Sequence, residues 1–61
     1  MTKKDFSQFL RIAYGSAGEL RTQTIIAHEL SYVDTTTYTP LMEYISEVER
    51  MLNNLIRSLL S

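Results

Sequence analysis

The stretch AYGSAGELRTQ, residues 13–23, decides how the first half of this 61-residue chain folds. Its two glycines, Gly15 and Gly18, fit either a phosphate-binding loop or the interior of a helix. The helix is favoured, because Ala13 and Ala17 continue a regular spacing of apolar residues through the stretch. Each glycine then costs roughly 1 kcal/mol relative to alanine. A dinucleotide-binding turn would also need a preceding strand, and the helical spacing argues against one.

The same spacing extends over residues 3–30 and predicts one long helix, capped by Thr2 with Asp5 three residues later. Apolar or small side chains recur at steps of four and three: Phe6, Leu10, Ala13, Ala17, Leu20, Thr24 and Ala27. We expect this seam to face a second helix. Positions beside the seam are also largely apolar, so the apolar arc is wider than one neighbour covers. The opposite side is expected to face water: Gln8, Arg11, Tyr14, Arg21, Thr22, His28 and Glu29.

A turn is expected at residues 31–35, and a second helix at about residues 36–60. The seam of the second helix comprises Tyr38, Leu41, Ile45, Val48, Leu52, Leu55 and Leu59. Pro40 fits the first turn of a helix capped by Thr39, or it bends a helix that starts after Asp34. The seam reaches back to Tyr38, which favours the earlier start. The predicted fold is all-α, one antiparallel helical hairpin that forms a single domain over residues 1–61.

One hairpin covers only one flank of each apolar arc, and large exposed apolar patches are unusual on monomers. We therefore expect self-association into a four-helix or larger bundle, most simply as a homodimer, with a higher ring as the alternative. The predicted oligomer interface comprises Phe9, Ile12, Ser16, Glu19, Gln23, Ile26, Leu30, Ile45, Leu52 and Ile56. The polar members, Ser16, Glu19 and Gln23, are expected to set register and pairing. Arg50, Arg57 or a group of the partner chain is expected to pair with Glu19.

Composition narrows the function. Six basic and seven acidic residues give a net charge of −1, whereas nucleic-acid binders usually carry a basic excess. The absence of cysteine excludes disulfides and thiolate metal sites. No apolar run approaches the ~20 residues that span a bilayer, so we expect a soluble, cytoplasmic chain without membrane contact. His28 is predicted at the surface, without the Glu-x-x-His spacing of di-metal bundles. We expect no cofactor, no metal and no enzyme activity.

The residues then show a family resemblance. The segment KKDFSQFLRIAYGSAGELRTQTIIAHELSYVD resembles the third helix and following turn of the small bacterial four-helix-bundle proteins of ribosomal-RNA intervening sequences. The segment MLNNLIRSLL, residues 51–60, resembles the end of the last helix of that family. The pattern is carried by Asp5-Phe6, Phe9-Leu10, Ile12-Ala13, Gly15-Ser16, Glu19-Leu20 and Leu30-Ser31-Tyr32. The chain departs from it at Gly18, Ser31 and Pro40.

The resemblance implies a left-handed helical bundle that self-associates, often as a ring of five, with no established enzyme activity. The resemblance covers nearly all of this chain. It covers only the C-terminal half of the usual family member, whose first two helices have no counterpart here. A second copy of the hairpin is expected to replace the missing helices. We expect an interaction or scaffold module with an unknown protein partner. The alternative is a nucleic-acid accessory factor, similar to the accessory proteins of retroelements, that uses Lys3, Lys4, Arg11 and Arg21 on the outer side of the first helix.

Overall fold

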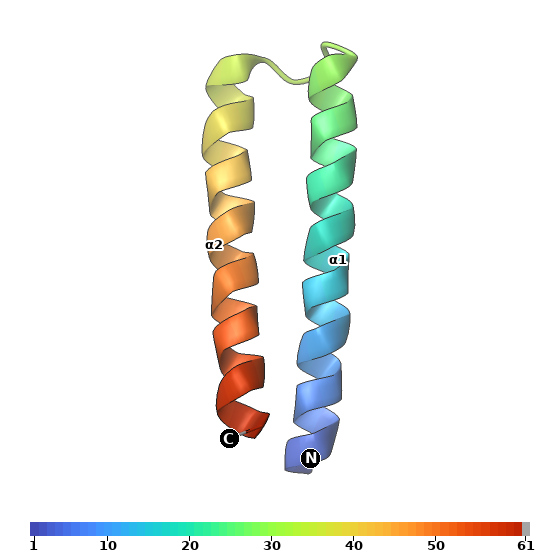
Figure 1. Cartoon of the computed structure of the whole chain (residues 1–61). Helices are drawn as coiled ribbons and strands as arrows, with labels where there is room; N and C mark the ends of the chain where they lie inside the picture. The colour runs from blue at the N-terminus through green and yellow to red at the C-terminus, as the bar shows by residue number, and fades with distance from the viewer. Residues whose placement is uncertain (61) are drawn as a thin grey trace.

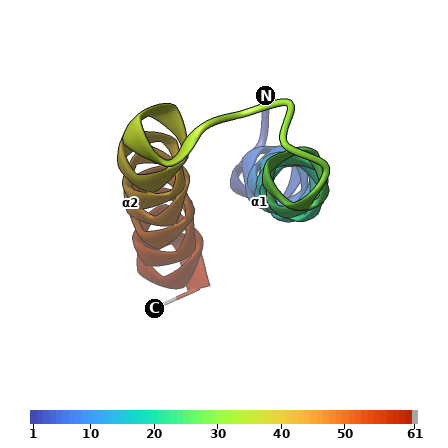
Figure 2. The ribbon, with the colours of Figure 1, turned by 90° about the horizontal axis from the view of Figure 1, so that it is seen from above.

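The computed structural model describes residues 1–60, which form two helices and no strand. Helix α1 spans Lys3–Glu29 and helix α2 spans Thr35–Leu60. The helices lie side by side and antiparallel, with both ends of the chain together and the turn at the opposite end (Figure 1). Figure 2, seen from above, shows the two helices beside each other in a single layer. The hairpin is 43 Å long. The predicted all-α hairpin is confirmed.

The deciding stretch lies inside α1, so its glycines belong to a helix and not to a phosphate loop. The helix begins as predicted, because the Thr2 side chain accepts from the Asp5 N–H at 3.0 Å. The Asp5 carboxylate accepts from the Thr2 N–H at 3.4 Å, which completes a capping box. A Cβ added at Gly15 or Gly18 would meet no atom within 4 Å. Packing within the protomer therefore does not require either glycine.

The end of α1 is closed by a left-handed residue. Ser31 has a φ of 67°, a conformation that usually selects glycine. The Tyr32 N–H donates to the Ala27 carbonyl at 2.9 Å, and the Ser31 N–H donates to the His28 carbonyl at 3.0 Å. These two bonds form the Schellman pattern, which satisfies carbonyls of the last helical turn. Ser31 is the position at which the sequence departs from the glycine of the resembled family.

Asp34 starts α2. Its carboxylate accepts from the Thr36 hydroxyl at 2.8 Å and from the Thr37 N–H at 2.9 Å. These hydrogen bonds hold the pKa of Asp34 below its usual value. The bond from the Thr36 hydroxyl has the larger effect, and the bond from the Thr37 N–H has the smaller one. Pro40 lies inside α2, which begins at Thr35. Of the two predicted starts of this helix, the earlier one, directly after Asp34, is therefore the one observed.

The hydrophobic core between the helices is small. Within residues 1–60, its buried hydrophobic side chains are Leu10, Ile45 and Ile56, which are 5%, 3% and 8% exposed. Thr24 is also buried, and its hydroxyl donates to the Leu20 carbonyl at 2.7 Å. Three seam predictions are wrong in detail. Phe6, Leu20 and Leu55 are 37%, 50% and 43% exposed. Ile56 occupies the buried position expected for Leu55.

Candidate interaction surface

The hairpin has two different sides. In both helices, an exposed apolar residue comes one position before a covered one: Phe9 before Leu10, Leu20 before Arg21, Tyr44 before Ile45, Met51 before Leu52 and Leu55 before Ile56. One residue back is a rotation of about 100° around a helix. Because the helices face each other and run in opposite directions, this rotation leads to the same side of the hairpin in both. The hairpin thus presents one broad apolar surface.

We call this surface the apolar face, formed by Phe9, Ile12, Leu20, Tyr44, Met51 and Leu55, all of them exposed. Ile26 and Leu30 continue the exposed strip of α1 toward the turn. Sequence reasoning assigned Phe9 and Ile12 to the interface but missed Leu20, Tyr44, Met51 and Leu55. The signal that identifies these residues is their place one step before the buried seam.

The predicted interface residues divide into two groups in the structure. All the predicted members from α1 and its C-cap are exposed: Phe9, Ile12, Ser16, Glu19, Gln23, Ile26 and Leu30. Ile45 and Ile56 are buried between α1 and α2, and Leu52 is half-buried there. The hairpin itself buries Ile45 and Ile56 and partly covers Leu52, so these three side chains offer less surface to a second chain than the predicted members from α1.

Glu19, the predicted charged member of the interface, pairs with neither of the two arginines of its own chain that were expected to serve it. It is exposed, and within residues 1–60 it has no hydrogen bond or ion pair with Arg50 or Arg57. The ion pair of the hairpin involves Arg21 and Glu49 instead.

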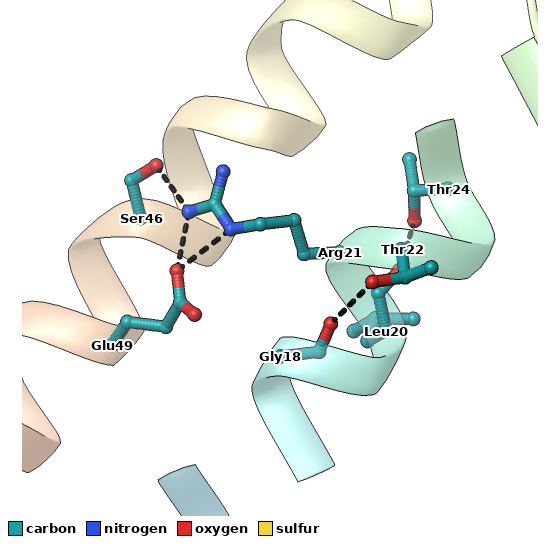
Figure 3. A network of polar contacts seen from close by, with 7 residues as sticks. All are labelled: Gly18, Leu20, Arg21, Thr22, Thr24, Ser46 and Glu49. Carbon is teal, nitrogen blue, oxygen red and sulfur yellow. Dashed lines mark hydrogen bonds and ion pairs between the residues drawn. The ribbon is translucent and has the colours of Figure 1, made fainter. Parts of the chain in front are cut away.

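The polar side of the hairpin carries this ion pair (Figure 3). The Nε and Nη2 atoms of Arg21 both donate to Oε1 of Glu49, the Nε bond at 3.0 Å. Nη2 also donates to the Ser46 hydroxyl at 2.7 Å. The bond to Glu49 raises the pKa of Arg21. Arg21 thus reaches across to α2, which corrects its predicted place on the outer side of α1.

His28 also differs from its prediction as a solvated residue. Its ring is half-buried and stacks on Tyr38, with centroids 3.9 Å apart and an interplanar angle of 14°. His28 Nε2 lies 3.4 Å from the Thr35 hydroxyl. The histidine therefore closes the turn end of the hairpin against α2. In the part of the chain that the structure describes, no group of three histidine, cysteine, aspartate or glutamate side chains could hold a metal.

The predicted nucleic-acid residues are only partly brought together. Lys3, Lys4 and Arg11 line one groove of about 650 Å³ at the open end of the hairpin, with Leu59 and Leu60 on its other wall. Arg21 does not line this groove, since it is bound to Glu49. Neither helix, over residues 1–60, has the length and apolar character to cross a membrane.

Comparison with known proteins gives one finding. The family model described as 23S rRNA-intervening sequence protein matches residues 1–54. Comparisons with curated proteins and with solved structures gave no significant match. The matched residues cover α1, the turn and most of α2. The chain therefore belongs to the family of 23S rRNA-intervening sequence proteins.

Proposed function

We propose that this chain is a non-enzymatic, self-associating helical module, in which the apolar faces of two copies meet to form a four-helix bundle. The single observation that carries the proposal is the imbalance between a small core and a large apolar face. Three hydrophobic side chains are buried over residues 1–60, whereas Phe9, Tyr44 and Met51 are each more than half exposed. A chain of this length that lacks disulfides usually needs a partner for stability.

The size of the apolar face suits a dimer. The hairpin measures 43 by 15 by 14 Å between Cα atoms, so one of its long sides has an outline of about 650 Å² before side chains are added. A stable interface buries about 800 Å² on each partner. Pairing two layers of two helices would cover both apolar faces and create a common core. A homodimer is the simplest closed assembly, and a higher ring is the alternative that the same face allows.

Sedimentation equilibrium over a wide range of concentrations tests this function. A dimer of the 7.1 kDa chain, with helical content that falls when the dimer dissociates, is the expected result. A folded monomer at all concentrations would refute self-association.

A second candidate function is supported by the groove at the open end. Lys3, Lys4 and Arg11 converge on it without an acidic residue in its lining, so it suits the phosphate backbone of a nucleic acid. Retention of RNA or DNA at low salt, lost when all three residues are changed to glutamine, supports this function. Equal retention of the triple variant would refute it.

A further inference from the structure

We infer that the second copy docks in one particular orientation, with the turns of both hairpins at the same end of the bundle. The two-fold axis then runs parallel to the helices, and α1 of each copy packs on α2 of its partner. This inference rests on the proposed self-association and adds its geometry. It follows from the sizes of the side chains along the apolar face and from a hollow on α2.

The heights of residues along the hairpin follow from the contact between His28 and Tyr38, whose rings stack near the turn. Each residue advances about 1.5 Å along its helix, so residues equally far from this pair lie at the same height. Ser16, twelve residues before His28, therefore lies level with Met51, thirteen residues after Tyr38. By the same reckoning, Phe9 lies close to the height of Ser58.

Side-chain sizes at these heights are complementary between the two helices. At mid-height, α1 presents the small, exposed residue Ser16, whereas α2 presents the large, exposed residue Met51. Near the open end the relation is reversed, because Phe9 of α1 is large and Ser58 of α2 is small. Large residues facing small ones interdigitate at the density of a protein core. Packing α1 on the partner's α2 produces these matches along the face.

A hollow on α2 marks the place for one of the large side chains. Met51, Asn54, Leu55 and Ser58 line this shallow hollow of about 380 Å³. With the turns at the same end, Phe9 of one copy lies at the height of the Ser58 end of the partner's hollow, so each copy places a large side chain at the hollow of the other. Leu55 supplies an apolar surface for the ring, which is itself 58% exposed in the single hairpin.

The opposite orientation, with the turns at different ends, packs α1 on α1 and α2 on α2. Because Ser16 and Met51 both lie at mid-height, the small Ser16 would then face the partner's Ser16, and the large Met51 would face the partner's Met51. One half of the interface would be left with voids, while the other half would be overpacked. The cationic grooves lie on the outer sides of either assembly, farther apart than the screening length of about 8 Å. Packing therefore decides the orientation, against the small repulsion between Glu19 and the partner's Glu47, which turns at the same end bring to one height.

Cross-linking of single-cysteine variants tests the inference, since the natural chain contains no cysteine. Ser16→Cys and Met51→Cys are oxidised, or treated with a short bis-maleimide, separately and as an equal mixture. Ser16 and Met51 lie at mid-height on different helices, so the inferred orientation brings them together only between unlike variants. The expected result is a covalent dimer in the mixture. Each variant treated alone should run as a monomer on a denaturing gel.

The other outcomes are distinguishable. Covalent dimers of each variant alone would overturn the inference in favour of turns at opposite ends. A dimeric mass in sedimentation without cross-linking in the mixture would also overturn it, while self-association stands. A mass above the dimer would exclude the two-fold pairing. A monomeric mass for the natural chain would refute the proposed function itself.

Discussion

Replacing Leu20 with glutamine tests whether the apolar face is an interface. Leu20 is 50% exposed in the hairpin, and burial of a whole leucine side chain contributes about 1.5–3 kcal/mol. Association would cover the remaining half, worth about 1 kcal/mol per copy. Two copies give about 2 kcal/mol per dimer, so Leu20→Gln should raise the dissociation constant at least about 30-fold. Leucine and glutamine have similar helix propensities, so α1 itself should be retained.

The matched control is Thr22→Gln, which places the same side chain two residues away on the polar side of α1. Thr22 is exposed there, and its hydroxyl donates only to the Gly18 carbonyl at 3.2 Å in its own helix. Sedimentation equilibrium gives both dissociation constants, and circular dichroism gives the helical content. The control should change the dissociation constant less than about 3-fold. Equal dissociation constants for Leu20→Gln and Thr22→Gln, with equal helicity, would refute the reasoning.

Further predictions concern stability and charge. Gly18→Ala should stabilise the protein by about 1 kcal/mol, because the added methyl group meets open space, and thermal melting should detect it. An unchanged or lower melting temperature would indicate that a partner approaches this glycine closely. Ser31→Gly should stabilise by about 0.5–1 kcal/mol in denaturant unfolding, since it relieves the left-handed φ of 67°; a destabilised variant would contradict this. The lowered pKa of Asp34 means that its stabilising effect is complete above about pH 4 and is lost as pH falls below it. Asp34→Asn keeps the cap, so its melting temperature should fall less than that of the natural chain in this acidic range; parallel curves would disprove the linkage. Glu19 and Glu47 lie at the same height, so turns at the same end bring Glu47 near the partner's Glu19. Glu47→Lys should then tighten the dimer about 2- to 30-fold by sedimentation, and weaker association would favour the opposite orientation.

The hairpin could be predicted from the sequence because the three-and-four spacing continues through both glycines. The cap at Thr2 followed from local residue types, and the early start of α2 followed from the seam that reaches back to Tyr38. The rotation of α1 about its axis could not be read from spacing. The apolar arc of α1 is so wide that several faces satisfy the pattern equally well.

The structure shows which face of α1 packs against α2, and which contacts hold it there. Arg21 finds Glu49 and Ser46 on α2, and His28 finds a stacking partner in Tyr38. These contacts join residues far apart in sequence, and they turn α1 so that Leu20 is left half exposed. A seam drawn only through apolar residues misses polar residues that pack between helices, and this also explains why Leu20 was misplaced.

Small-angle scattering from the natural chain, with the molecular mass taken from the forward intensity, tests most directly whether copies share their apolar faces. The expected mass is twice that of the 7.1 kDa chain. Because the hairpins pair side by side, the particle should be hardly longer than the 43 Å of one hairpin. A mass of 7.1 kDa from well-folded, helical protein at the highest concentration would contradict the central claim.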